Sequence, residues 1–231
     1  MSLAMRYAPL GDQAVTITLG DTIDEATHRR VRAVVARLDR DRPSGMIDRV
    51  AAFASVTVHY DPAAVGGESP YDGFVANLTA MLSDVDEAAS APARLVEIPV
   101  CYGGDLGPDL ADVAAQHDLT EAEVVDIHVA AEYLVYMVGF MPGFAYLGGL
   151  DPRIATPRRR SPRKAVPAGM VGIGGQQTGV YPTVSPGGWN LIGCTPRAVF
   201  DIRRDEASLL AMGDRVRFRP ITRGEFDAWR E

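Results

Sequence analysis

Residues 139–196 constrain the fold more than any other part of this sequence, because glycine and proline recur throughout them. Proline has no backbone N–H and its ring clashes with the preceding helical turn, so long helices are excluded here. Short β-type runs such as Ala165–Ile173 lie between the glycines and prolines. Many short strands joined by Gly/Pro turns predict a β-barrel or a compact sandwich, and the runs 197–202 and 215–218 would add its final strands.

The N-terminal part of the chain shows alternating strand and helix patterns. Period-2 alternation and β-branched residues predict strands at residues 13–19, 47–53 and 55–60. Helical spacing of apolar residues predicts helices at 24–40 and from Pro70, where Ser69 is the expected cap. A strand at 94–100 would complete the order βαββαβ, which is the ferredoxin-like split motif.

With 231 residues, the chain is long enough for two small hydrophobic cores. We therefore expect an α+β protein with two domains, residues 1–90 and 91–231. The boundary is expected between residues 86 and 100, where small residues predominate.

The second domain opens with helical patterns at residues 108–116 and from Thr120, where Thr120 and Glu123 form a capping box. His128 lies beside the apolar face of the second helix, and Glu132 would follow one turn later. A core histidine with satisfied hydrogen bonds fits this position. A general base oriented by Glu132 also fits it, and this alternative gives His128 a catalytic role.

Charge and cysteine content exclude several classes of function. Acidic residues outnumber basic ones by 30 to 23, whereas sequence-independent binding of nucleic acid needs dense Lys and Arg. No apolar run approaches the roughly 20 residues that span a bilayer, and the N-terminus has no leader pattern. Cys101 and Cys194 are too few for a disulfide framework or a metal site. We expect a cytoplasmic protein that binds neither nucleic acid nor membrane and holds no metal.

The segment Gly139–Leu147 is typical of a rigid apolar wall, because aromatic rings alternate with residues that fix or free the backbone. Phe140, Pro142 and Phe144 are predicted to contact the substrate, and the hydroxyl of Tyr146 is predicted to take part in catalysis. A loop that only fills a core is the structural alternative.

A dense basic stretch at residues 157–164 offers guanidinium groups for a carboxylate or a phosphate. Arg158 and Arg163 stand next to prolines, which limit their movement, so they are the predicted anion ligands. Arg159 and Arg160 are expected on the surface. A solvated loop with salt bridges is the alternative.

Glycines allow close backbone approach to a ligand over residues 169–179. Gln176, Thr178 and Tyr181 offer neutral hydrogen-bonding groups for an amide or a carboxylate, while tight β-turns are the alternative reading. Neither GxxxxGK[ST] nor a GxGxxG that opens a helix occurs, so no ordinary nucleotide loop is predicted.

The next segment combines a hydroxyl, two glycines and an indole. Gly187, Gly188 and Trp189 are predicted to contact substrate. Ser185 is a candidate nucleophile, and it would need His128 as its base.

A long ordered set of short segments rich in Gly, Pro and aromatic residues extends from about residue 8 to residue 220. It includes PLGDQAVTI, SVTVHYDP, IPVCYGGDLGPDL, GFMPGFAYLGGL and PRRRSPRKAVPAGMVGIGGQQTGVYPTVSPGGWNLIGCTP. These segments resemble those of the family of the 5-oxoprolinase B-type subunit, which is also described as allophanate hydrolase subunit 1 and as KipI-like kinase inhibitors. Met170 departs from the family, whose members commonly have Ser after this Pro-Ala-Gly turn.

The resemblance implies a ferredoxin-like N-terminal domain followed by a cyclophilin-like β-barrel. It also implies two partners, a C-type subunit (allophanate hydrolase subunit 2) and an A-type subunit, which together with this chain would hydrolyse 5-oxoproline to glutamate at the expense of ATP. ATP is expected at the level of the complex, with no site located in this chain, and the chain is expected to be inactive alone. A histidine kinase inhibitor and a carboxyltransferase-like half of a urea amidolyase system are the alternatives.

Overall fold

The computed structural model describes residues 5–85 and 93–229. The chain divides into two compact units, residues 1–92 and 93–231. The stretch of small residues expected at the domain boundary lies mostly outside the described residues. No helix among the described residues is long and apolar enough to cross a membrane.

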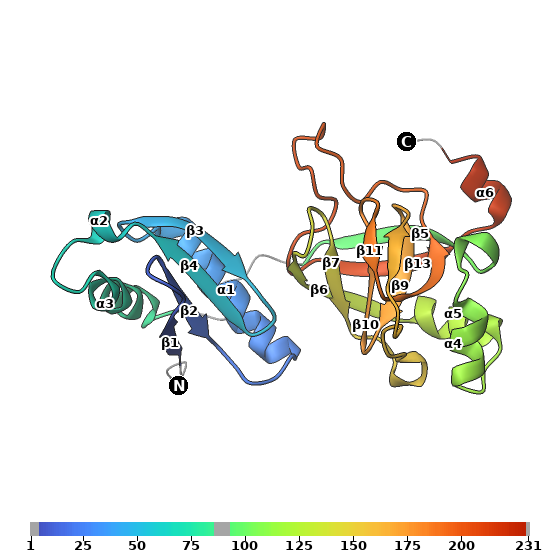
Figure 1. The fold of residues 1–231 in the computed structure, drawn as a ribbon, viewed down its shortest axis with the longest axis horizontal. Helices are drawn as coiled ribbons and strands as arrows, with labels where there is room; N and C mark the ends of the chain where they lie inside the picture. Colours follow the sequence, from blue (N-terminus) through green and yellow to red (C-terminus); the bar gives the residue numbers. More distant parts are fainter. Residues whose placement is uncertain (1–4, 86–92, 230–231) are drawn as a thin grey trace. The chain divides into compact units, whose positions relative to one another are not determined.

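The first unit is an antiparallel four-stranded sheet with the strand order β1-β2-β4-β3 (Figure 1). Its strands are β1 (Arg6–Pro9), β2 (Ala14–Thr18), β3 (Met46–Ala51) and β4 (Ser55–Tyr60). Its helices are α1 (Glu25–Asp41), α2 (Pro62–Val65) and α3 (Pro70–Leu82). These elements confirm the three strands and two helices predicted in this region, while β1 and the short α2 were not expected.

Alternating apolar residues of β2 and β4 make the sheet half of the core of the first unit. Ile17 and Val56 are fully buried, as is Val34 of α1, whose Asp24 cap accepts a hydrogen bond from Thr27 N. Tyr60 and Phe74 stack with ring centres 4.4 Å apart and so join α3 to the sheet. The helix α3 begins as predicted, but the hydroxyl of its cap residue Ser69 donates to Asp72 rather than accepting a backbone N–H.

The predicted βαββαβ order is wrong in its last strand. Residues 94–100 fall in β5 (Leu95–Tyr102), which pairs with β13 and β12 in the second unit and not with the first sheet. Val96, Ile98 and Val100 of this strand are buried in the barrel core. The edge of the first sheet beside β2 is instead occupied by β1, so the ferredoxin-like motif lacks its expected closing strand.

The second unit is a closed seven-stranded barrel with the order β10-β7-β6-β13-β5-β12-β9. The remaining strands of the barrel are β6 (Glu132–Val138), β7 (Ala145–Gly148), β9 (Met170–Gly174), β10 (Gln177–Val180), β12 (Asn190–Cys194) and β13 (Arg215–Pro220). A separate pair is formed by β8 (Arg163–Val166) and β11 (Ser185–Gly187). The barrel prediction is confirmed, and its cyclophilin-like character stays a prediction.

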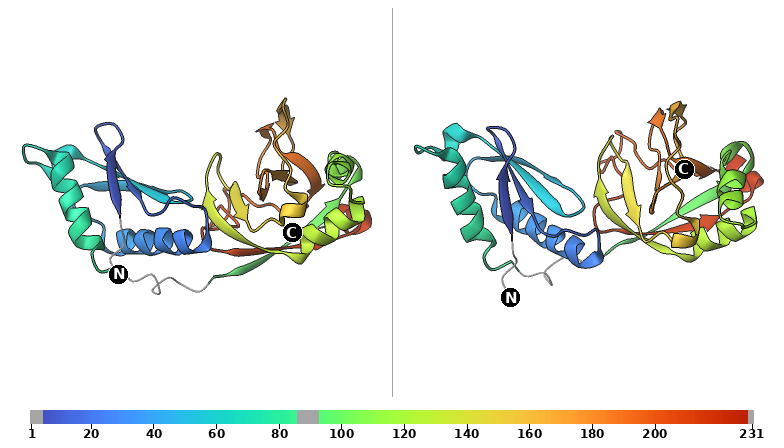
Figure 2. Two further views of the ribbon diagram at one scale, coloured as in Figure 1. Left: turned by 90° about the horizontal axis from the view of Figure 1, so that it is seen from below. Right: turned by 60° about the horizontal axis from the view of Figure 1, so that its bottom comes forward.

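Helices lie beside the barrel, as Figure 2 shows. The adjacent helices α4 (Leu110–Gln116) and α5 (Glu121–Ala130) pack against β12 and β13 respectively. The predicted capping box is present at the start of α5. Two short 3₁₀ turns (Gly104–Leu106 and Pro152–Ile154) and α6 (Arg223–Asp227) complete the unit.

Two strand predictions in the second unit need correction. The run Ala165–Ile173 is divided between β8 and β9, because the chain turns at Gly169, where φ is +84°. The predicted strand at 197–202 is a loop whose Phe200 makes a single bridge to Ser208. Side-chain hydrogen bonds bend this loop locally, because Asp201 accepts the backbone N–H of Arg203.

Candidate functional site

A cavity of about 180 Å³ in the barrel unit collects most of the residues predicted to form the site. Its lining comes from the segment around β7, the loop before β8, the residue that follows β10, and the β11–β12 connection. The lining residues are Phe140, Phe144, Tyr146, Arg158, Arg159, Pro162, Tyr181, Gly187, Gly188 and Trp189.

The wall of this cavity is a cluster of aromatic rings centred on Phe144. The ring centre of Phe144 lies 5.0 Å from that of Tyr146, 5.5 Å from that of Tyr181 and 5.4 Å from that of Trp189, all edge to face. Trp189 packs so closely on β9 that a Cβ at Gly174 would lie 2.5 Å from the indole nitrogen. Phe144, Tyr181 and Trp189 are buried, so this wall is built rigidly into the barrel.

Phe140 stands at the rim of the cavity with 65% of its surface exposed. Its φ is +72°, in the left-handed region that a bulky residue rarely adopts. The ring contacts Phe144 edge to face at 5.6 Å. Backbone strain of this kind concentrates at binding sites.

Arg158 supplies positive charge to the cavity. Its guanidinium carbon lies 5.9 Å from the centre of the Trp189 ring, within the range of a cation–π contact. An anion in the cavity can therefore meet a guanidinium that is already placed against the aromatic wall.

Asp109 binds two further arginines of the basic stretch 157–164, Arg159 and Arg163. Its carboxylate accepts from Arg159 Nη1 at 2.7 Å, from Arg163 Nη1 at 2.8 Å and Nη2 at 2.7 Å, and from Leu191 N at 2.7 Å. Asp109 is buried. Burial alone would raise the pKa of Asp109, but the hydrogen bonds from Arg163 and Leu191 and the charges of the two arginines outweigh it. The resulting pKa is below the usual value.

The sequence did not predict the role of Asp109, because this residue reads as part of the first turn of a helix. Its partners lie about fifty positions further along the chain. Arg159 is exposed as predicted, but it also lines the cavity and binds Asp109, which was not expected. Arg163 does bind a carboxylate, but that carboxylate is Asp109 of the protein itself, and Arg163 is not among the residues that line the cavity.

Tyr181 places a hydroxyl at the wall of the cavity. Burial raises the pKa of Tyr181 above its ordinary value near 10, although the backbone N–H of Trp189 and the arginine charges act in the opposite direction. The phenol is therefore protonated at neutral pH and can donate a hydrogen bond. Gly187 leaves space for it, because a Cβ at this position would overlap the Tyr181 ring.

The predicted catalytic role of His128 is not supported by its surroundings. The ring is completely buried, its Nδ1 lies 2.9 Å from the hydroxyl of Tyr102, and its Nε2 lies 3.0 Å from Thr178 Oγ1. Burial lowers the pKa of His128 to about 3, so the ring is a poor base. His128 is a core histidine with satisfied hydrogen bonds, and Phe218 stacks on it at 4.6 Å.

The other parts of the proposed triad are also separated. Glu132 lies in β6 rather than on the helix, and its carboxylate contacts Arg217 at 3.4 Å. Ser185 does not line the cavity, and within residues 5–85 and 93–229 its hydroxyl has no hydrogen-bond partner. No Ser–His–Glu relay is formed by Ser185, His128 and Glu132.

Three predicted substrate ligands lie elsewhere. Thr178 is buried and donates to the carbonyl of Gly172 while it contacts His128, so its hydroxyl serves the barrel core. Gln176 is exposed at the turn between β9 and β10, and Pro142 is exposed next to the wall without lining the cavity.

The comparisons with known proteins agree with this architecture. Residues 5–210 match the family described as "Carboxyltransferase domain, subdomain C and D". The chain is 44% identical to the B-type subunit of 5-oxoprolinase from Bacillus subtilis (strain 168), over 100% of this chain and 99% of that protein. It is 43% identical to the B-type subunit of 5-oxoprolinase from Escherichia coli O157:H7, over 93% of this chain and 95% of that protein.

One solved structure is similar to this chain at low sequence identity, and this similarity shows the fold only. The urea carboxylase of Kluyveromyces lactis superposes with a TM-score of 0.73 at 19% identity, covering 96% of this chain and 22% of that protein. The barrel with its attached first unit is therefore an architecture that also occurs inside a much longer chain.

Proposed function

The chain belongs to the family of the carboxyltransferase domain, subdomains C and D, and from this premise we propose that it is the B-type subunit of an ATP-dependent 5-oxoprolinase. The observation that carries the proposal is the small aromatic cavity with Arg158 placed against Trp189. This cavity lies in a chain that matches B-type subunits of 5-oxoprolinase along almost their whole length.

The size and chemistry of the cavity suit 5-oxoproline. Its volume of about 180 Å³ is below the roughly 300–1,000 Å³ of sites for larger ligands, which favours a molecule of amino-acid size. We assign the carboxylate of 5-oxoproline to Arg158 and the flat lactam ring to the wall formed by Phe144 and Trp189. Phe140 at the rim is assigned to the edge of the same ring.

Opening of the lactam adds the hydroxyl of water to the carbonyl carbon, breaks the C–N bond and leaves the proton on nitrogen, which gives glutamate. The carbonyl oxygen gains negative charge in this step, and a fixed hydrogen-bond donor stabilises that charge. The protonated hydroxyl of Tyr181 is the group we assign to it, with the hydroxyl of Tyr146 as the second polar group at the same wall.

The proposal includes partners. A C-type subunit (allophanate hydrolase subunit 2) and an A-type subunit would complete the enzyme, ATP would be consumed by the complex, and this chain would be inactive alone. The assembly would be cytoplasmic, where the free thiols of Cys101 and Cys194 stay reduced.

The experiment that tests the proposal measures 5-oxoproline-dependent ATP hydrolysis by the reconstituted three-subunit mixture, with and without this chain. We expect turnover only when the chain is present. Arg158→Ala should raise the apparent KM for 5-oxoproline about tenfold or more, because a hydrogen-bonded charge is removed. Arg153→Ala is the matched control, since Arg153 is exposed and paired with Asp151 outside the cavity.

Two results would contradict the proposal. Turnover that is the same without the chain, with both partners shown to be active, would remove its role in the reaction. An unchanged KM in Arg158→Ala would remove the assignment of the substrate carboxylate to Arg158.

A further inference from the structure

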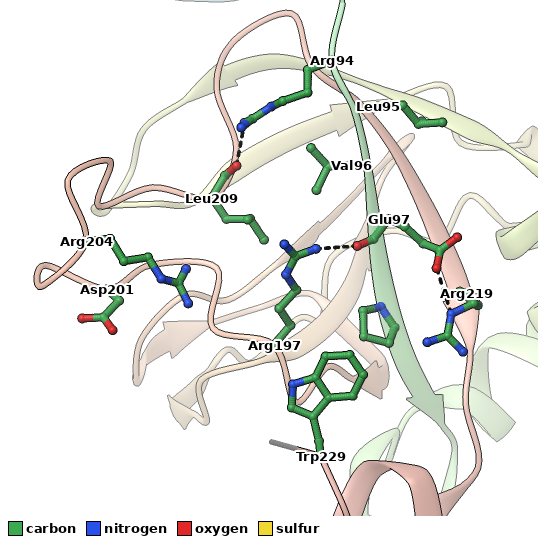
Figure 3. A pocket seen from close by; sticks show the side chains of 11 residues that line it. Arg94, Leu95, Val96, Glu97, Arg197, Asp201, Arg204, Leu209, Arg219 and Trp229 are labelled. Atoms are coloured by element: carbon green, nitrogen blue, oxygen red, sulfur yellow. Dashed lines mark hydrogen bonds and ion pairs between the residues drawn. The ribbon is translucent and has the colours of Figure 1, made fainter. Parts of the chain in front are cut away.

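The barrel unit contains a second and larger cavity, of about 880 Å³, that shares no lining residue with the first. Figure 3 shows it from close by, between β5, β13, the loop of residues 197–209 and the C-terminal segment. Its lining residues are Arg94, Leu95, Val96, Glu97, Pro99, Arg197, Asp201, Arg204, Leu209, Arg219 and Trp229.

The charge of this lining is opposite to that of the whole chain. Four arginines and two carboxylates line the cavity, whereas the chain has a formal net charge of −7. A concave surface that keeps an excess of guanidinium groups on an acidic protein attracts anions to that place.

Arg197 is the residue that leaves its charge available. Its Nη1 donates to the backbone carbonyl of Glu97 at 2.8 Å, which fixes the side chain without neutralising it. Among the described residues, no carboxylate forms an ion pair with Arg197. Figure 3 shows its guanidinium in the middle of the cavity, with Arg204 pointing toward it from the neighbouring part of the loop.

The arginines on either side are used differently. Arg94 binds the carboxylate of Asp214 at 2.6 Å and the carbonyl of Leu209 at 2.7 Å, so it closes one side of the cavity. Arg219 donates to the carboxylate of Glu97 at 2.9 Å. These bonds hold the walls in place and leave the centre to Arg197.

We propose that this second cavity binds a phosphate-bearing small molecule, with Arg197 as the central anion ligand and Arg204 as its neighbour. A guanidinium fork can donate two parallel hydrogen bonds to one phosphate group, and two forks suit a ligand with several such oxygens. The volume lies within the roughly 300–1,000 Å³ of small-molecule sites, so there is room for more than one phosphate group. The indole of Trp229 offers an apolar surface beside them (Figure 3).

The two tryptophans of the sequence make the two cavities separately observable. Trp189 lines the first cavity and Trp229 lines the second. In a Trp189→Phe chain, the remaining fluorescence reports on the second cavity. Sodium tripolyphosphate is the probe, because it carries several phosphate groups and does not absorb where tryptophan does.

We expect a saturable change of Trp229 fluorescence on titration of the full chain with tripolyphosphate at constant ionic strength. Arg197→Gln in the same background should weaken this binding about tenfold or more. Arg197→Lys keeps the charge and loses the fork, so its binding should lie between the two. Arg153→Gln removes one positive charge outside both cavities and should leave the affinity unchanged.

Three outcomes would overturn the inference: the absence of saturable binding, an equal loss in Arg153→Gln and Arg197→Gln, or saturation by citrate but not by tripolyphosphate. Circular dichroism and urea unfolding establish whether each variant is folded. If Arg197→Gln does not fold, Arg197→Lys takes its place as the test variant. The inference goes beyond the proposed function, because tripolyphosphate binding is measured without 5-oxoproline turnover and either result can fail alone.

Discussion

The two cavities of the barrel unit are both bordered by arginines, yet the arginines are held by different partners. Beside the small cavity, the buried carboxylate of Asp109 binds both Arg159 and Arg163, and Arg158 lies against an aromatic ring. In the large cavity, Arg94 and Arg219 also have carboxylate partners, but Arg197 is fixed by a backbone carbonyl. A carboxylate partner makes an arginine part of the framework, whereas a carbonyl partner positions it and leaves its charge for a ligand.

The test of this comparison with the largest expected effect is the substitution Asp109→Ala. The change leaves two guanidinium groups and the backbone N–H of Leu191 without their shared acceptor, and Asp109 is buried. Arg159 and Arg163 stay partly exposed to solvent, so the loss is that of the hydrogen bonds to a buried charged group, about 1.5–3 kcal/mol. We expect a loss of this size in the free energy of unfolding, measured by urea denaturation of the full chain.

The matched control for Asp109→Ala is Asp105→Ala. Asp105 pairs with Arg223, and its side chain is 72% exposed, so this change should alter stability by no more than about 1 kcal/mol. Similar losses in both variants would show that Asp109 does not organise the small cavity.

The lowered pKa of Asp109 adds a pH dependence with a defined sign. Its pKa in the folded state lies below the value of about 3.9 expected in the unfolded chain. The stabilisation is therefore fully present above about pH 4 and is lost as the pH falls through the folded-state pKa. Asp109→Asn should remove this part of the acid sensitivity.

A second test concerns the rigidity of the aromatic wall, and it compares substitutions at two neighbouring glycines that line the small cavity. An Ala at Gly187 would overlap the buried ring of Tyr181, whereas at Gly188 the nearest atoms belong to Pro162 at an ordinary 3.7 Å. Neither glycine has a positive φ, so the difference is one of space.

We expect Gly187→Ala to destabilise the chain by about 1–3 kcal/mol and to reduce 5-oxoproline turnover in the reconstituted mixture. Gly188→Ala should change stability by no more than about 0.5 kcal/mol. Urea denaturation and the turnover assay measure both variants. Equal effects would mean that the position of Tyr181 is not set by the space at residue 187.

The features that could be predicted from the sequence are those that depend on neighbouring residues. The capping box of Thr120 and Glu123 and the strand at 55–60 are local patterns, and both are present. The aromatic wall was also visible, because Phe144 and Tyr146 lie within a few residues of each other and the Gly/Pro composition around them excludes helix.

The features that escaped prediction depend on contacts between distant residues. β5 pairs in parallel with β13, whose residues lie about 120 positions further along the chain, so its local pattern could not show to which unit it belongs. The partners of Asp109 could not be predicted for the same reason. The sequence was compatible with a core role or a catalytic role for His128, and its contacts with Tyr102 and Thr178 favour the core role.

The smallest expected effect concerns salt, and it separates the two cavities most directly. Salt screens the attraction between charges at accessible sites, and a ligand with several charges has more of this attraction to lose. A ligand with several phosphate groups in the arginine-lined cavity should therefore lose affinity as potassium chloride rises. 5-Oxoproline carries one carboxylate, and Arg158 meets it beside Trp189. Its dissociation constant should change by less than about twofold, or about 0.4 kcal/mol.

Both constants can be measured with the tryptophans as reporters, tripolyphosphate in Trp189→Phe and 5-oxoproline in Trp229→Phe, from low to high potassium chloride. If the two ligands respond equally to salt, the large cavity does not bind several phosphate groups through several arginines, and the contrast between the two sites is lost. If tripolyphosphate is weakened more, the large cavity contributes more than one positive charge to its ligand, whereas Arg158 contributes one to 5-oxoproline. The arginines around Asp109 then belong to the framework that gives the small cavity its shape.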